Sequence, residues 1–391
     1  MKLSNRIQNI NKGGSDGWEV FLKARQMIAE GHDVVELTIG EHDRRTDATI
    51  LKAMYSSATG GNTGYASIPG IQPLREAIAA RVQTRTGVTT THENIIVTPG
   101  GQAALFASHM AVCDPGDTAL YLNPYYATYP GTLRATGCVD VPVPTRSANA
   151  FQPTRDELLA YAKGAKSLLI NSPNNPSGVV YSRETMGIIA DVCKAHDLWL
   201  ISDEVYDTQV WEGTHISPRQ LPGMAERTLV IGSMSKSHAM TGSRVGWVVA
   251  PPDVVRRLID LSTNTTYGVP GFIQDAALFA LRQGDPLEED VAAPFRRRRL
   301  LAQDVLKGAN AVRLVPSGGA MYLMLDIRAT GLSGLDFAYA LLDAEKIAVM
   351  PGESFGTSAA GHLRVAMTID DDRFADALKR LVAFAQNKAT G

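Results

Sequence analysis

The sequence predicts an α/β fold: a large domain with a mostly parallel sheet covered by helices, plus a smaller α+β domain built from the N- and C-terminal parts of the chain. Three observations support this prediction. Short aliphatic runs alternate with amphipathic stretches between about residue 70 and residue 285. The runs are apolar almost throughout, which is typical of strands covered on both faces. The chain has 391 residues, of which 45% are hydrophobic, so it can bury a core of this size.

The large domain is expected to span residues 46–285, with strands and helices in alternation. Short apolar runs next to Gly, Pro or Asn predict the strands, and stretches with apolar residues three and four positions apart predict the helices. We therefore expect strands at 94–99, 118–123, 166–173, 198–204, 228–233 and 245–251, and helices at 101–113 and 183–197.

The C-terminal part of the chain has a different texture, with short strands around one helical stretch. We expect strands within 311–327, 347–356 and 362–369, and a helix at 334–346. Residues 286–391 are therefore predicted to form the smaller domain, and the N-terminal segment 1–45 is predicted to join it.

The composition excludes several classes of function. The formal net charge is −2 and no basic block covers a domain, which argues against nucleic acid and anionic membranes as partners. The run Arg296–Arg299 is interpreted as a solvated helix face. The chain has no run of about 18 apolar residues, no secretory signal, and no metal-like spacing of its three cysteines. We therefore expect a cytoplasmic protein with reduced thiols.

Four of the predicted strands end in glycine or polar residues. Gly100–Gly101 follows the first strand and Asn174–Asn175 follows the third. Asp203 ends the fourth strand, and Lys236 follows the fifth. Ligands of an open α/β sheet bind beyond the carboxyl ends of its strands. We therefore expect these residues to share one site.

Lys236 stands among small hydroxyl residues directly after an apolar strand, with Arg244 eight positions further on. A lysine amine forms Schiff bases with carbonyl compounds, and its pKa falls when it is desolvated or near another cation. Both conditions suit Lys236. We therefore predict that it acts as a nucleophile toward a carbonyl group.

The same strand ends predict a phosphate site. A glycine pair between a strand and a helix leaves backbone N–H groups free and directs the positive end of the helix dipole at the crevice. Serine hydroxyls add donors, and an arginine can bind a phosphate in bidentate form. The residues expected to bind the phosphate are Gly100, Gly101, Gln102, Ser233, Ser235 and Arg244.

A lysine that traps an aldehyde beside a phosphate site indicates pyridoxal 5'-phosphate. This cofactor needs an acidic partner for its ring nitrogen, because the protonated ring is the electron sink, and Asp203 ends the right kind of strand. Tyr206 and Asn175 are predicted to bind the ring hydroxyl oxygen, and Tyr126 is predicted to stack on the ring. The catalytic residues are then Lys236, Asp203 and Tyr206.

An amino-acid substrate needs a cation for its carboxylate, and Arg364 in HLRVAM is the candidate. We place Gly40, Asn175 and Arg364 in the substrate site. Ordinary roles stay open for single residues, since Asp203 could cap a helix and Tyr126 could belong to the core. The constellation as a whole favours the cofactor site.

Four motifs, TGYASIPGIQPLREAIA, SPNNPSG, SDEVY and SMSKSHAMTGSRVGW, occur in this order. From ELTIGEHD to HLRVAM the chain resembles a class I/II aminotransferase of the aspartate aminotransferase superfamily, which is fold type I among pyridoxal-phosphate enzymes. The resemblance implies transfer of an amino group from an L-amino acid to a 2-oxo acid by a ping-pong mechanism. It also implies a homodimer with shared active sites, in which Tyr65 reaches the neighbouring subunit's phosphate.

Two departures from the family pattern bear on the substrate. The family's usual GEPDF is GEHDR here, with His42 in place of proline. In aspartate-specific bacterial relatives a lysine follows the glycine pair and contacts the side-chain carboxylate, whereas Gln102 stands there. Lining by Gln102, His42 and Tyr267 would suit dicarboxylic, aromatic or other neutral side chains, so the donor stays open. A pyridoxal-phosphate-dependent carbon–sulfur β-lyase on the same fold stays open as the alternative function.

Overall fold

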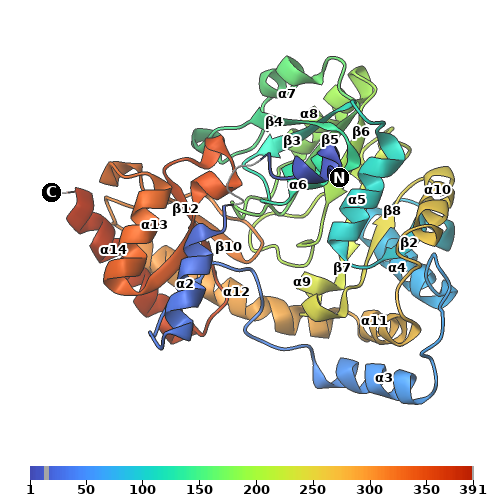
Figure 1. The fold of residues 1–391 in the computed structure, drawn as a ribbon, viewed down its shortest axis with the longest axis horizontal. Helices are drawn as coiled ribbons and strands as arrows, with labels where there is room; N and C mark the ends of the chain where they lie inside the picture. The colour runs from blue at the N-terminus through green and yellow to red at the C-terminus, as the bar shows by residue number, and fades with distance from the viewer. Residues whose placement is uncertain (13–16, 390–391) are drawn as a thin grey trace.

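The computed structural model describes residues 1–12 and 17–389, and it confirms the α/β prediction (Figure 1). Its larger sheet is built from β2 (Ile95–Thr98), β3 (Thr118–Asn123), β4 (Val139–Pro144), β5 (Ser167–Asn171), β6 (Trp199–Asp203), β7 (Thr228–Ser233) and β8 (Gly246–Val249). The strand order is β2-β8-β7-β6-β5-β3-β4. The pairs from β7 to β4 are parallel, so the carboxyl ends of β5, β6 and β7 meet at one edge of the sheet.

Two strands differ from the expectation. β8 runs antiparallel to both of its neighbours, because α9 (Met234–Ser237) is the only α-helix between β7 and β8 and is too short for a crossover. β4 was not expected at all. It is an edge strand with Pro142 and Pro144 in its sequence and a largely exposed surface, so it lacks the apolar pattern of the buried strands.

Helices cover both faces of the larger sheet, as expected from its apolar strands. Leu169 of β5 packs with the helices of one face, whereas Leu168 and Ile170 pack with those of the other, which is the two-residue period of a strand. The first face carries α5 (Gly101–Val112), α6 (Tyr129–Thr136) and α10 (Pro252–Thr263). The second carries α7 (Arg155–Ala162) and α8 (Arg183–Ala195), with α3 (Ala48–Thr59), α4 (Gln72–Thr86) and α11 (Gly271–Gln283) over β2 and β8.

The smaller sheet joins the two ends of the chain. It contains β1 (Val35–Leu37), β9 (Arg313–Leu314), β10 (Tyr322–Asp326), β11 (Ile347–Pro351) and β12 (His362–Ala366), in the order β1-β11-β12-β10-β9. Only the β1–β11 pair is parallel. One core holds this sheet together with α2 (Glu19–Ala29), α12 (Asp285–Leu306), α13 (Gly334–Glu345) and α14 (Asp371–Ala389).

The N-terminal segment contacts both groups of elements. α2 and β1 lie with the smaller sheet, whereas α1 (Asn5–Gln8) lies near α6 of the larger one. There the Lys12 amine donates to Asp140 at 2.9 Å, and the Arg134 guanidinium donates to the Ile10 carbonyl at 2.5 Å. The domain boundaries 1–45, 46–285 and 286–391 stay predictions.

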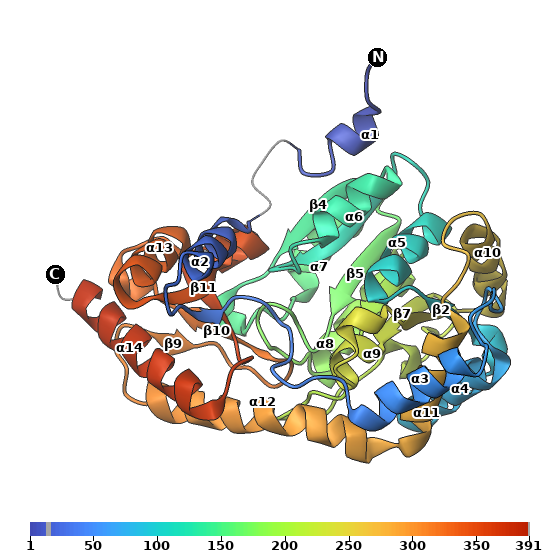
Figure 2. The same cartoon turned by 60° about the horizontal axis from the view of Figure 1, so that its bottom comes forward.

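Helix α12 runs along the lower edge of the molecule, from α11 to the region below α14 (Figure 2). The interpretation of Arg296–Arg299 as a solvated face is wrong for two of its residues, because Arg298 and Arg299 are only 3% and 4% exposed. Arg298 pairs with Asp43 at 2.6 Å and with Asp371 at 2.8 Å, so carboxylates compensate its buried charge. The sequence shows the four charges but not the covered side of the helix.

None of the helices within residues 1–12 and 17–389 has the length and hydropathy of a membrane span. The three cysteines are free and buried.

Candidate active site

A cavity of about 350 Å³ lies at the carboxyl ends of β5, β6 and β7, where the strand ends were expected to form a site. Elements of the smaller sheet close it from the other side, because β12 and the segment that follows β1 reach into its wall. The structure thereby brings together most of the residues expected from the sequence. Those that line the cavity are Gly40, Gly101, Gln102, Tyr126, Asn175, Asp203, Tyr206, Ser233, Ser235, Lys236, Arg244 and Arg364.

Lys236 faces this cavity from the single turn α9, directly after β7. Its amine donates to the carbonyl oxygen of Gly40. Removal from bulk water lowers the pKa of Lys236. The nearby Tyr322 and Glu41 oppose this shift, whereas the positive charges of Arg364 and Arg244 add to it. A lysine with a depressed pKa holds more of its amine in the neutral form that attacks carbonyl groups and accepts protons.

Asp203 ends β6 and is buried beside the cavity. Burial raises the pKa of Asp203 to about 6, although the Tyr129 hydroxyl donates to its carboxylate at 2.6 Å and the Val205 N–H donates at 3.3 Å. Within the part of the chain that the structure describes, no cation pairs with it. A buried carboxylate of this kind is suited to a cationic ligand group such as a protonated ring nitrogen.

The expected phosphate end of the cavity depends on a glycine. Gly100 has a φ of +84°, and a Cβ on it would lie 2.3 Å from Nη2 of Arg244, so a side chain would push this guanidinium away. The first N–H groups of α5 have no partners within the helix. Ser233 lies beside Gly101, where its hydroxyl accepts the N–H of Ser235 at 3.1 Å and donates to the Val245 carbonyl at 3.2 Å. The free N–H groups of α5 and the Arg244 guanidinium fit a phosphate group.

Arg364 is the most informative side chain of the site. It lies in the middle of β12, is 1% exposed, and its guanidinium lies 4.6 Å and 4.4 Å from the ring centres of Tyr322 and Phe355. It donates to Oδ1 of Asn175 at 3.0 Å and to the carbonyl oxygen of Thr38, while its Nε has no partner. No carboxylate of the described residues pairs with it. A buried guanidinium without a counter-charge is costly, so the site fits a ligand that brings a carboxylate.

Tyr129 and Tyr322, which the sequence did not single out, complete the wall of the cavity. The hydroxyls of Tyr206 and Tyr322 share a hydrogen bond of 3.0 Å, and the Tyr129 hydroxyl binds Asp203. Tyr322 also explains the glycine at position 40, since a Cβ on Gly40 would lie 1.7 Å from the Tyr322 hydroxyl oxygen. The position of Tyr322 follows from the register of β10 and β12, which no local motif reveals.

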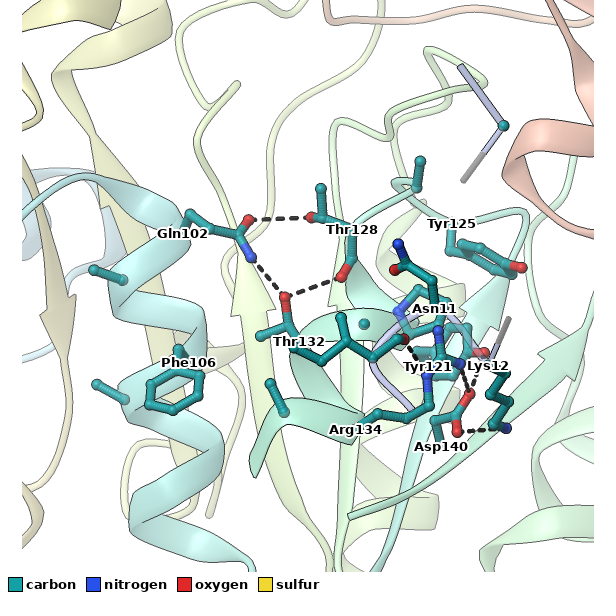
Figure 3. Close-up of a pocket in the computed structure, with 18 of the residues that line it drawn as sticks. Asn11, Lys12, Gln102, Phe106, Tyr121, Tyr125, Thr128, Thr132, Arg134 and Asp140 are labelled. Atoms are coloured by element: carbon teal, nitrogen blue, oxygen red, sulfur yellow. Dashed lines mark hydrogen bonds and ion pairs between the residues drawn. The ribbon is translucent and has the colours of Figure 1, made fainter. Parts of the chain in front are cut away.

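Gln102 forms the border between this cavity and a larger one of about 1220 Å³, and both cavities are also lined by Trp18. Figure 3 shows the Gln102 side chain turned toward α6, where its amide nitrogen donates to the Thr132 hydroxyl at 2.5 Å and its oxygen accepts from Thr128 at 3.1 Å. The two threonines therefore hold both polar atoms of the Gln102 amide.

His42 and Tyr267 are not among the residues that line this cavity, and their expected place beside the substrate stays a prediction. The His42 ring packs edge-on against Phe295 of α12 and lies under the turn of Lys236. Tyr267 is half exposed and packs against the ring of Tyr65, which is 93% exposed and lies outside the cavity. The cross-subunit role of Tyr65 stays a prediction.

Comparison with known proteins identifies the relatives of this chain. Residues 32–381 match the model of the family described as aminotransferase class I and II. The arginine–pyruvate transaminase of Pseudomonas aeruginosa is 40% identical over 98% of each chain. The aspartate/prephenate aminotransferase of Thermus thermophilus is 35% identical over 97% of each chain.

Solved structures agree with these relatives. The aspartate aminotransferase of Thermus thermophilus with maleate superimposes with a TM-score of 0.91 at 34% identity, over 98% of this chain and 100% of the other. The aromatic aminotransferase of Pyrococcus horikoshii superimposes with a TM-score of 0.87 at 31% identity, over 93% and 99%.

Proposed function

The chain belongs to the class I and II aminotransferases, and we propose that it carries out its amino-group transfer with pyridoxal phosphate attached to Lys236. It is a transaminase that moves an amino group from an amino acid to a 2-oxo acid, as its named relatives do. The relatives named above do not favour the β-lyase alternative. The three buried free cysteines support a reducing, cytoplasmic location.

The observation that carries the proposal is the buried, uncompensated Arg364 in one cavity with Lys236 and Asp203. Arg364 supplies the charge that an α-carboxylate needs, and Asp203 supplies the charge that a protonated pyridine nitrogen needs. Gly100, Gly101, Gln102, Ser233, Ser235 and Arg244 would hold the phosphate. When bound, pyridoxal phosphate supplies an aldehyde that bonds to amines and a ring that accepts an electron pair from the substrate's α-carbon.

The side chains then have separate tasks. Arg364 orients the substrate through its carboxylate, and Asn175 accepts a hydrogen bond from Arg364 at 3.0 Å in the same cavity. The amine of Lys236, whose pKa is lowered by burial, removes the α-proton and holds it at Nζ until it is returned. Asp203 would supply the negative charge for the ring nitrogen, and Tyr206 and Tyr126, which line the same cavity, would hold the ring.

For the amino donor we propose a long, cationic or neutral side chain, with arginine as the first candidate and pyruvate as the first acceptor. The 40% identical relative is named for these two substrates. The active-site cavity adjoins the larger one at Trp18 and Gln102, and carboxylates line both of them, Glu41 the first and Glu353 the second. A long side chain has room there, and a guanidinium would find opposite charge.

Replacing Gln102 with lysine is expected to change this preference. The new ammonium group would give a side-chain carboxylate a charge partner, so kcat/KM for aspartate should rise about tenfold relative to phenylalanine, and that for arginine should fall. The measurement is kcat/KM for arginine, phenylalanine and aspartate, with pyruvate as acceptor.

The matched control is Gln102→Met, which keeps the length of the side chain but loses the contacts to Thr128 and Thr132 without adding charge. It should leave the ratio of aspartate to phenylalanine within about threefold of the unmodified enzyme. A preference of the unmodified enzyme for aspartate of a hundredfold or more would overturn the inference from Gln102.

We further propose a homodimer in which Tyr65 completes the partner's phosphate site. The Tyr65 side chain is 93% exposed on the surface of its own chain, and its ring packs against the ring of Tyr267. Tyr55 and Leu51 are exposed as well, at 71% and 47%. Exposed aromatic and aliphatic side chains of this kind favour an interface with another chain.

Hybrid dimers test this sharing. Chains with Tyr65→Phe are mixed with chains that carry Lys236→Ala, after dissociation and reassembly. If Tyr65 acts across the interface, one site of each hybrid carries both defects and the other carries neither, so activity should exceed that of either parent by severalfold. If mixing the two variants restores no activity, or if ultracentrifugation shows that the fully active enzyme is a monomer, each site is built from one chain alone.

A further inference from the structure

The turn that carries Lys236 is held from outside by the segment Gly40–His42. The Gly40 carbonyl accepts from the Lys236 amine, and the His42 ring lies 3.0 Å from the Lys236 carbonyl oxygen through Nε2. Two residues of one short segment thus contact the two ends of a single lysine. This arrangement concerns the position of the lysine and not the binding of substrate, because His42 does not line the cavity.

The chemistry of the contact identifies its donor. A carbonyl oxygen only accepts, so the hydrogen is on Nε2 of His42. Burial and the nearby Lys236 charge lower the pKa of His42 to about 3, so the ring is neutral and its other nitrogen is bare. That nitrogen, Nδ1, is buried and has no partner, which agrees with this tautomer.

The His42 ring is itself fixed to helix α12. It packs edge-on against Phe295 with 5.4 Å between ring centres, and Phe295 is 1% exposed. The next residue, Asp43, pairs with Arg298 about one turn further along the same helix, at 2.6 Å. The donor of this hydrogen bond therefore has little freedom to follow a displaced lysine.

We propose that His42 is a positioning residue that fixes the backbone of Lys236, so that the lysine amine meets the aldehyde of pyridoxal phosphate in the bonding geometry. This inference rests on the proposed attachment of the cofactor to Lys236. α9 is a single turn, so the last carbonyl groups of the helix find no partner within it. The Lys236 carbonyl takes its hydrogen bonds from other segments, from His42 and from Gln209 at 3.1 Å. The usual family motif has proline at position 42, which donates no hydrogen bond from its side chain.

The test compares two forms of the cofactor. Pyridoxal phosphate bonds to Lys236 through its aldehyde, whereas pyridoxamine phosphate has an amine in that place and makes no such bond. His42→Phe keeps a ring against Phe295 but removes the donor. We expect the dissociation constant of pyridoxal phosphate, measured by fluorescence titration, to rise about tenfold, with that of pyridoxamine phosphate unchanged. kcat should fall by a similar factor while KM for the amino donor stays the same.

Two further variants complete the experiment. His42→Gln restores a donor at a similar reach and should return the dissociation constant to within about threefold of the unmodified protein. Thr46→Val is the matched control, since it removes a hydrogen bond of 2.7 Å to the neighbouring Ala239 carbonyl without touching Lys236, and it should change neither affinity. If His42→Phe does not fold, His42→Pro takes its place, because the family motif has proline there.

The outcomes separate the two proposals. A selective loss of affinity for pyridoxal phosphate that glutamine reverses supports the role of His42. Unchanged affinity for pyridoxal phosphate in a folded variant without the donor, or an equal loss for both cofactor forms, overturns it. If the unmodified protein binds neither form, the proposed use of the cofactor fails and not the role of His42 alone.

Discussion

Replacing Lys236 with alanine is expected to lower kcat for transamination by at least about 10⁴-fold, which corresponds to about 5.4 kcal/mol of transition-state stabilisation. Lys236 is proposed both to bond the cofactor and to move the α-proton, and acid–base catalysis alone contributes up to about 10⁴. Since the pocket of Arg364 and Asp203 is left intact, KM for the amino donor should change much less than kcat. Steady-state kinetics with the preferred donor give both numbers.

The control is Lys163→Ala. Lys163 is an exposed lysine that follows α7, far from the strand ends that form the cavity, and its loss should leave kcat within about twofold. A Lys236→Ala enzyme that retains a tenth or more of the unmodified rate would remove the lysine from the mechanism.

The second large effect is expected at Asp203. Asp203→Ala should lower kcat/KM by at least about 10³-fold, or about 4 kcal/mol, because the ring nitrogen loses the charge that keeps it protonated. Some cofactor should still bind, since the phosphate donors and Lys236 are separate from Asp203. The measurements are kcat/KM and the cofactor content of the purified variant.

Tyr129→Phe is the matched control for Asp203, because it removes the 2.6 Å hydrogen bond to this carboxylate and leaves the charge in place. It should lower kcat/KM by about tenfold or less. Near-normal turnover in Asp203→Ala would instead show that Asp203 has no role in the chemistry.

Much of the site could be predicted because its residues follow apolar strands. The runs before Asp203 and Lys236 are almost wholly apolar, and parallel strands place their carboxyl ends at one edge of the sheet. Local pattern therefore sufficed to bring these two residues together. Gly100 was predictable for a similar reason, since a glycine between a strand and a helix indicates a positive φ or a close approach.

What could not be predicted depends on contacts between distant segments. Tyr322 reaches the site only because β10 pairs with β12 in one register, and Tyr129 reaches Asp203 across the end of the sheet. Arg298 is buried because α12 packs into the core of the smaller sheet and meets Asp43 and Asp371 there. No spacing within the sequence indicates these pairs, and the same holds for the contact of His42 with Lys236.

The attachment of pyridoxal phosphate to Lys236 is tested most directly by borohydride reduction of the purified protein, followed by peptide mapping. Reduction turns the imine between an aldehyde and a lysine amine into a stable secondary amine that survives digestion. We expect one phosphopyridoxyl group per chain, on Lys236 in the peptide that contains SMSKSHAMTGSR. An adduct confined to another lysine, or a protein that never takes up the cofactor, would contradict the assignment.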